Sequence, residues 1–389
     1  MSQTANPSPQ ELLKTAKRLV VKLGTNVLSR DSGELALGRI HTLIEEVVDL
    51  VRSGRQVTIV TSGAIALGME RLGVRERPQL LADKQACAAV GQSRLMAVYQ
   101  DAFDRYRIPT AQILLTEEDF TDRNRYLNLR NAFQRLLALG VVPIVNENDT
   151  VSTSEIETVE DRTPVFGDND TLSALVASKL EADALFLLTD VDGLYTAPPG
   201  EPGARRLAVV AEITPEIEAM AGAGSTRGRG GMRTKLHAAK IATRSGVLVV
   251  IARGTDPGML RRISTGQIDG GQIDGTVFLP QAGLSGRKRW IAFATSVSGR
   301  VRVNSGARAA LVERQASLLF TGVTALEADF KRGEVVSILD EAGREFARGV
   351  VNYARADAEP FVGKKSAEVR TAAGHGDDEL IHRDNIVVL

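Results

Sequence analysis

The chain has 389 residues, which is long enough for two or three domains. Its 48 Lys and Arg residues balance 48 Asp and Glu residues, so the chain as a whole carries no excess charge for a nucleic acid or an anionic membrane. A single cysteine, Cys87, excludes an intramolecular disulfide and a thiolate zinc cluster. No apolar run reaches the ~18 residues of a membrane span. These features predict a globular protein of the reducing cytoplasm.

The first two thirds of the chain alternate predicted strands and helices. The expected strands are 18–24, 56–63, 111–116, 141–149, 184–190 and 247–254, and the expected helices include 40–51, 82–103, 128–140 and 231–246. The strands are apolar on both faces, which predicts an α/β domain: a three-layer αβα sandwich around a largely parallel sheet. In such folds ligands bind beyond the carboxyl ends of the strands.

The pattern changes after a tandem repeat of GQIDG at 266–275, which is typical of a tolerated linker expansion. Beyond it come a predicted helix at 307–315 and a hairpin across Asp340–Gly343, so a small, mainly-β domain is expected. The expected divisions are a disordered tail (1–17), an α/β domain (18–262), a Gly-rich linker (263–285), a β domain (286–370) and a C-terminal extension (371–389).

Two glycine loops lie at the expected ligand edge of the sheet. Lys22 is followed by Leu-Gly-Thr-Asn, and a second glycine-rich stretch runs from Gly228 to Lys235. Neither loop contains the P-loop motif GxxxxGK[ST], and each one alone is compatible with a tight turn. Two such loops at one sheet edge favour anion binding, because glycines let backbone N–H groups approach phosphate oxygens and lysine adds charge.

Carboxylates and amides follow two further elements. NEND (146–149) ends a strand, and GDND (167–170) precedes an apolar helical run. Helix capping explains one polar residue of GDND, but not three. Asp149 and Asn169 are candidates to hold the amino group and backbone carboxylate of an amino acid, and Asp170 is a candidate to orient the two lysines. The four histidines show no metal-ligand spacing, and TSGA around Ser62 is not the GxSxG of a serine hydrolase.

The motifs VVKLGTNVLS, VTSGAIALG, PIVNENDTV, FGDNDTLSALVA, LLTDVDGLYT and GGMRTKLHAAKIA resemble, in order, those of the glutamate 5-kinases. These enzymes belong to the amino-acid kinase family, and the resemblance runs from about residue 18 to residue 254. From RKRWIAF onward, GARAALVERQASLL and FKRGEVVSIL resemble the PUA domain that many bacterial members carry.

This resemblance implies ATP-dependent phosphorylation of the γ-carboxylate of L-glutamate to glutamyl 5-phosphate, the first step of proline biosynthesis. It also implies Mg²⁺ held mainly through the ATP phosphates, feedback inhibition by proline and a homo-oligomer. The implied catalytic residues are Lys22, Asp170 and Lys235, and the implied glutamate-binding residues are Ser62, Asp149 and Asn169. The implied ATP-binding residues are Lys22, Thr189, Asp190, Arg229, Gly230, Gly231, Met232, Arg233, Thr234 and Lys235.

The sequence departs from the family pattern at Arg229, where many members have threonine, and at Arg233, where some have serine. The segment 157–165 is longer than in some members. One alternative is another amino-acid kinase, acting on aspartate, acetylglutamate, carbamate or a nucleoside monophosphate. A second is an RNA-binding protein, but residues 281–389 hold 16 Lys and Arg against 14 Asp and Glu, which is weak for a phosphate-binding surface.

Overall fold

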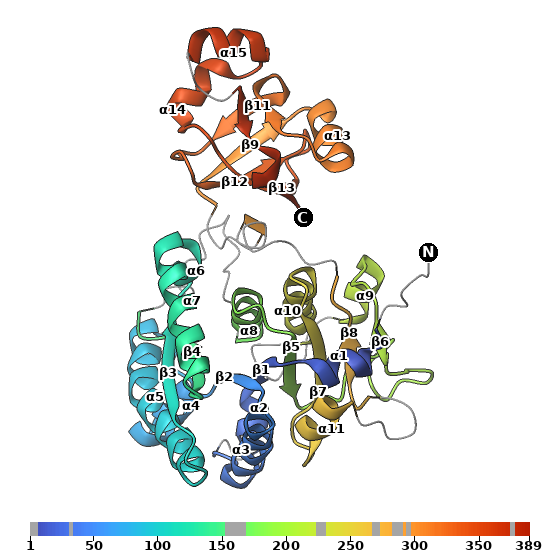
Figure 1. Cartoon of the computed structure of the whole chain (residues 1–389). Coiled ribbons are helices and arrows are strands. Elements are labelled where there is room, and N and C mark those ends of the chain that lie inside the picture. Colours follow the sequence, from blue (N-terminus) through green and yellow to red (C-terminus); the bar gives the residue numbers. More distant parts are fainter. Residues whose placement is uncertain are drawn as a thin grey trace. The chain divides into compact units, whose positions relative to one another are not determined.

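The computed structural model describes residues 7–30, 34–151, 169–222, 231–266, 273–281, 291–292, 297–373 and 378–389. The chain divides into two compact units, Met1–Gly283 and Leu284–Leu389 (Figure 1). Each unit has a hydrophobic core of its own. No helix in the described ranges is both long and apolar enough to cross a bilayer.

The first unit is built on an eight-stranded sheet in the order β3-β4-β2-β1-β5-β7-β8-β6. Neighbouring strands are parallel except β7 and β8, so the prediction of a largely parallel sheet is confirmed. The strands are β1 (Arg18–Leu23), β2 (Gln56–Val60), β3 (Thr110–Leu115), β4 (Val142–Glu147), β5 (Ala184–Thr189), β6 (Val209–Val210), β7 (Leu248–Arg253) and β8 (Thr276–Phe278).

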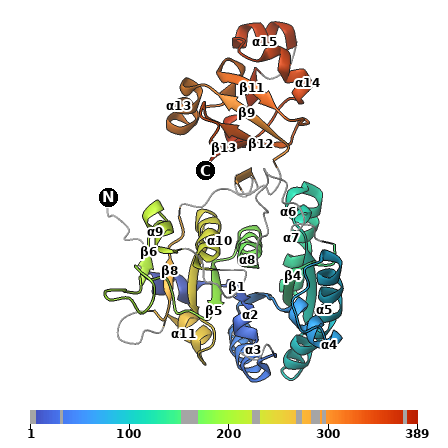
Figure 2. The ribbon, with the colours of Figure 1, turned by 180° about the vertical axis from the view of Figure 1, so that it is seen from behind.

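Helices cover both faces of this sheet (Figures 1 and 2). They are α1 (Pro9–Thr15), α2 (Thr25–Leu28), α3 (Leu37–Arg52), α4 (Ala64–Leu72), α5 (Leu81–Asp104), α6 (Glu118–Thr121), α7 (Arg123–Ala138), α8 (Asn169–Lys179), α9 (Pro215–Met220), α10 (Met232–Arg244) and α11 (Met259–Thr265). On one face α1, α3, α5 and α11 share a core with the sheet, and on the other α8 packs on β1, β5, β2 and β4, beside α10.

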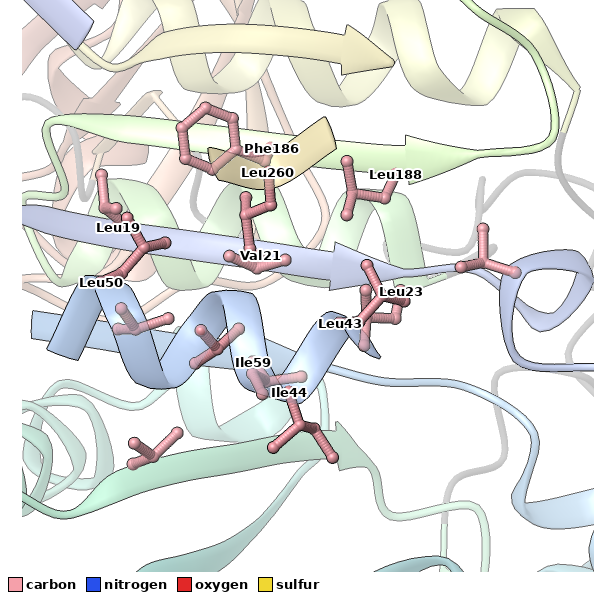
Figure 3. Packing of buried hydrophobic residues seen from close by; sticks show 14 of the residues in the cluster. Leu19, Val21, Leu23, Leu43, Ile44, Leu50, Ile59, Phe186, Leu188 and Leu260 are labelled. Carbon is pink, nitrogen blue, oxygen red and sulfur yellow. The ribbon is translucent and has the colours of Figure 1, made fainter. Parts of the chain in front are cut away.

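The alternation of side chains along β1 decides which residue reaches the site. Leu19, Val21 and Leu23 pack in the core toward α3 and α11, as Figure 3 shows. Because successive side chains of a strand point to opposite faces, Val20 and Lys22 lie on the face that α8 covers. Every residue of α8 from 170 to 179 is buried, so this helix is enclosed on all sides. A lysine at the end of β1 is thereby directed at the start of a buried helix.

The structure differs from the expected divisions at two places in the first unit. Helix α1 lies in the range expected to be a disordered tail: Ser8 and Glu11 form a capping box, and Leu13 is buried in the core. Strand β8 lies in the range expected to be a linker, where it pairs antiparallel with β7 and buries Val277 and Phe278. Short elements such as these carry too few residues to show a hydrophobic period.

The second unit contains a five-stranded sheet, β11-β9-β12-β13-β15, and a two-stranded sheet, β10-β14. Its elements are β9 (Gly299–Val303), α13 (Ser305–Arg314), β10 (Leu318–Leu319), β11 (Val323–Glu327), β12 (Val335–Leu339), β13 (Glu345–Val350), α14 (Arg355–Ala358), α15 (Ser366–Ala373), β14 (Glu379–Ile381) and β15 (Ile386–Val388). The predicted hairpin is present as β12 and β13. Strands β14 and β15 pair with β10 and β13, so the expected C-terminal extension is part of the sheets.

Candidate active site

The site lies where the adjacent parallel strands β4, β2, β1 and β5 end. Lys22 is near the end of β1, Ser62 follows β2, Asn146 is near the end of β4, and Thr189 ends β5. Helices α8 and α10 begin at the same edge, because Asp170 and Lys235 in their first turns touch each other. The ends of four strands and the starts of two helices therefore bring residues from six separate stretches of sequence to one edge, as expected for the ligand edge of an α/β sheet.

The centre of the site is a buried carboxylate between two lysines. Nζ of Lys22 lies 2.6 Å from Oδ1 of Asp170, and Nζ of Lys235 lies 3.1 Å from its Oδ2. The hydroxyl of Thr234 donates to the same Oδ2 at 3.1 Å. Asp170 is 1% exposed, whereas Lys22 and Lys235 are 7% and 6% exposed. Asp170 thus fixes the positions of both ammonium groups.

The electrostatics of this cluster favour an anionic ligand. Burial alone would raise the pKa of Asp170, but the ion pairs with Lys22 and Lys235 outweigh it and lower that pKa to about 2. Two ammonium groups then face one carboxylate, so these three side chains together carry a net charge of +1. Burying an unbalanced charge is costly, so a phosphate group that supplies the missing negative charge would be bound favourably.

A second cluster is built from amides. The Nδ2 group of Asn169 lies within hydrogen-bond distance of three acceptors, which share its two hydrogens: the carbonyl of Thr61 at 2.6 Å, Oγ of Ser62 at 2.9 Å and Oδ1 of Asn146 at 3.0 Å. Asn146 in turn donates to Oε1 of Gln92 at 2.9 Å. Asn169 and Asp170 are consecutive, so the amide cluster lies directly beside the lysine pair. An amino acid held by the amides would therefore sit close to groups that attract phosphate.

A third group of contacts orders the end of β5. The hydroxyl of Thr189 donates to Oδ1 of Asp190 at 2.9 Å, and Nδ2 of Asn26 donates to its Oδ2 at 2.9 Å. Burial raises the pKa of Asp190, but these hydrogen bonds hold it below its ordinary value. Asp190 therefore links helix α2, which follows β1, to the end of β5, where the family resemblance implies nucleotide contacts for Thr189 and Asp190.

The structure brings together most of the residues predicted from sequence. Lys22, Asp170 and Lys235 are in direct contact, and Ser62 contacts Asn169. Asp149 lies two residues beyond β4 and is half-buried. In the second glycine loop, Gly231 is the N-cap of α10, Met232 and Arg233 open that helix, and Arg233 is exposed. Arg229, Gly230 and the segment 157–165 lie outside the described residues.

Sequence reasoning missed the residues behind the site. Gln92 and Tyr99 both lie on α5, where Tyr99 is fully buried and its hydroxyl is 2.8 Å from Oγ1 of Thr61. Their partners are 54 and 38 residues away in sequence, so no local spacing signals either contact. Their separation of seven residues, two helical turns, is the one available signal, because it puts both on the same side of a helix.

Comparison with known proteins identifies both units. Residues 17–253 match the model of the amino acid kinase family, and residues 299–372 match that of the PUA domain. The chain therefore belongs to the amino acid kinase family. Within that family, several relatives that match nearly the whole chain are glutamate 5-kinases. The enzyme of Moorella thermoacetica is 50% identical over 381 residues, which cover 97% of each chain.

Two further relatives carry the same name. The glutamate 5-kinase of Trichormus variabilis is 47% identical over 96% of this chain and 99% of its own length. That of Cupriavidus taiwanensis is 45% identical over 98% of this chain and 100% of its own length. The similarity thus extends over both units, which bears out the resemblance seen in the sequence motifs.

Proposed function

We propose that this chain transfers the γ-phosphoryl group of ATP to the γ-carboxylate of L-glutamate and so produces glutamyl 5-phosphate for proline synthesis. The observation that carries the proposal is the buried pair of lysines held by Asp170 next to an amide cluster. The names of the relatives, which match this chain over almost its entire length, supply the substrate.

The chemistry requires no general base. A glutamate side chain has a pKa of about 4.3, so its carboxylate is ionised at neutral pH and can attack directly. An oxygen of that carboxylate bonds to the γ-phosphorus, the bond to the bridging oxygen breaks, and ADP leaves. Catalysis then depends on holding the two anions together and on offsetting the charge that develops in transfer. Lys22 and Lys235 are placed for that role.

The donor set fits a magnesium ion carried by the nucleotide. Among the described residues, no group of three His, Cys, Asp or Glu side chains is close enough to hold a metal. The carboxylate of Asp170 is engaged by two ammonium groups and a hydroxyl. We therefore propose that Mg²⁺ is held mainly by the ATP phosphates, where it neutralises phosphate charge.

Inhibition by proline and assembly into a homo-oligomer complete the proposal. Proline shares an α-carboxylate and a cationic α-nitrogen with glutamate, so a site that reads those groups would accept both. Proline would then compete with glutamate at this site.

The test is an acceptor panel with hydroxylamine, which traps an acyl phosphate as a hydroxamate. With ATP and Mg²⁺, L-glutamate should give hydroxamate, whereas L-aspartate and N-acetyl-L-glutamate should give little. Carbamate and nucleoside monophosphates are tested by ADP release. Phosphorylation of one of these alternatives in preference to glutamate would overturn the proposal.

A further inference from the structure

The amide cluster forms a hydrogen-bonded chain with a defined direction. It runs from Gln92 on α5 through Asn146 on β4 and Asn169 on α8 to the carbonyl of Thr61. A backbone carbonyl can only accept a hydrogen bond, so the amide group of Asn169, and not its oxygen, faces Thr61. The same group then faces Oδ1 of Asn146, which turns the amide group of Asn146 toward Oε1 of Gln92. Turning Asn169 or Asn146 round would bring two oxygens or two N–H groups together.

This direction decides what the site offers to a ligand. The Nδ2 group of Asn169 has two hydrogens and already faces three acceptors. Among the described residues, no group donates a hydrogen bond to the side-chain carbonyl oxygen of Asn169, which is therefore the atom available to a ligand and can only accept. Oγ of Ser62 faces the Nδ2 donor of Asn169, so the hydroxyl hydrogen of Ser62 points elsewhere and remains available as a donor. An acceptor beside a donor matches the α-ammonium and α-carboxylate groups of an amino acid, respectively.

The buried position of Gln92, at the far end of this series of hydrogen bonds, lowers the stability of the fold. Gln92 is 8% exposed, and its Nε2 group has no hydrogen-bond partner among the described residues. A buried donor without a partner costs about 1–3 kcal/mol. An apolar side chain of similar size would avoid that cost, which argues against a purely packing role. The contact that an apolar residue would lose is the acceptor for Asn146.

The motifs name Asp149 and Asn169 as candidates to hold the amino group and the α-carboxylate of an amino acid. We propose that Gln92 and Asn146 are positioning residues, which hold Asn169 so that its oxygen is one acceptor for the α-ammonium group of glutamate while Ser62 donates to the α-carboxylate. The proposal rests on the function proposed above and adds the residues that select an α-amino acid. Gln92 touches neither substrate and acts through Asn146 alone.

The test compares L-glutamate with glutarate, which has both carboxylates but lacks the ammonium group. Gln92→Met removes the acceptor and keeps the size of the side chain, whereas Gln92→Glu keeps an acceptor. Gln100→Met, at an exposed position of the same helix, is the matched control. The readouts are kcat, the KM values for glutamate and ATP, the inhibition constant of glutarate, and the melting temperature.

Gln92→Met should raise the KM for glutamate by about tenfold, the scale of one hydrogen bond to a charged group. The inhibition constant of glutarate, kcat and the KM for ATP should stay within about twofold of the wild type. Gln92→Glu and Gln100→Met should both have wild-type kinetics, and only Gln92→Glu should have a lower melting temperature, because it buries a carboxyl group.

If Gln92→Met raises the KM for glutamate and the inhibition constant of glutarate by the same factor, the positioning role is overturned. An unchanged KM for glutamate would overturn it as well. If Gln92→Met does not fold, Gln92→Glu decides the question. Hydrogen bonds that run in the opposite direction would need a donor at position 92, which a glutamate side chain does not supply, so Gln92→Glu would then raise the KM for glutamate more than the inhibition constant of glutarate. A wild-type protein that fails to phosphorylate glutamate would instead overturn the proposed function and, with it, the ammonium assignment.

Discussion

At the scale of single residues, Asp170 is the residue that holds the other charged groups of the site in position. It contacts Lys22 and Lys235 from two different elements, and all three side chains are buried. A group that is held in place before the reaction needs no reorganisation as charge develops, so its effect on the rate is larger than in water. The two lysines should therefore matter more for kcat than for substrate binding.

Replacing either lysine with methionine tests this expectation. Lys22→Met and Lys235→Met should each lower kcat by about 10²–10³, the usual loss for one preorganised electrostatic donor. Steady-state kinetics with saturating glutamate and ATP measure the effect. A wild-type kcat in both folded variants would contradict the assignment.

Asp170 should also make stability depend on pH. The lysines lower its pKa in the folded protein to about 2, whereas an unfolded aspartate titrates near 3.9. The stabilisation from its ionised form is therefore present above about pH 4 and is lost as the pH falls toward 2. The free energy of unfolding of the wild type should approach that of Asp170→Asn over this range. A difference between the two that stays constant from pH 5 to pH 2 would show that Asp170 titrates normally.

At the scale of elements, a close contact between α4 and α5 positions the start of α4. A Cβ added to Gly91 of α5 would lie 1.7 Å from the carbonyl oxygen of Ala64, and one added to Gly68 of α4 would lie 1.8 Å from that of Cys87. Both obstacles are backbone atoms, which move only with their helix. Ser62 lies just before α4, so the distance between the two helices bears directly on the amide cluster.

Gly91→Ala should therefore separate the two helices. We expect a loss of about 1–3 kcal/mol in the free energy of unfolding, the usual range for overpacking, together with a higher KM for glutamate. Gly38→Ala in α3 is the control, because nothing lies within 4 Å of its added Cβ, and it should raise stability by up to about 1 kcal/mol. Chemical denaturation measures the free energy of unfolding of the two variants. Equal values for Gly91→Ala and Gly38→Ala would show that the contact between α4 and α5 is not tight.

The contrast between β1 and β8 shows how much of the fold could be predicted from sequence. β1 is an apolar run with Lys22 near its end and Gly24 directly after it, so the local sequence indicates both the strand and the functional residue at its end. β8 has three residues and gains its place by pairing with β7. The site shows the same division: Lys22, Asp170 and Lys235 stand in recognisable motifs, whereas the contact between Gln92 and Asn146 exists only after folding.

At the scale of the whole molecule, the two units have separate cores. The core that includes β1, α3 and α5 lies within the first unit, and the core of β9, β12 and β13 lies within the second. The residues of the candidate site all belong to the first unit. A chain that ends at Gly283 should therefore fold and retain the reaction.

Truncation after Gly283 tests both activity and regulation. The shortened chain should keep kcat within about threefold of the full chain, since the transition-state contacts are retained. Inhibition by proline should persist and should be relieved by glutamate, because both ligands would use the same site. Proline inhibition that is lost on truncation, or that glutamate leaves unchanged, would place the inhibitor site elsewhere.

The central claim is that Asp170 holds Lys22 and Lys235 in register for phosphoryl transfer, and kcat of Asp170→Asn tests it most directly. Asparagine keeps the size of the side chain but removes the charge that pairs both lysines. With folding verified by thermal melting, kcat should fall by about 10² or more, while the KM for glutamate changes little. A folded Asp170→Asn variant with wild-type kcat and a raised KM would contradict the account, because Asp170 would then bind substrate rather than organise the catalytic charges.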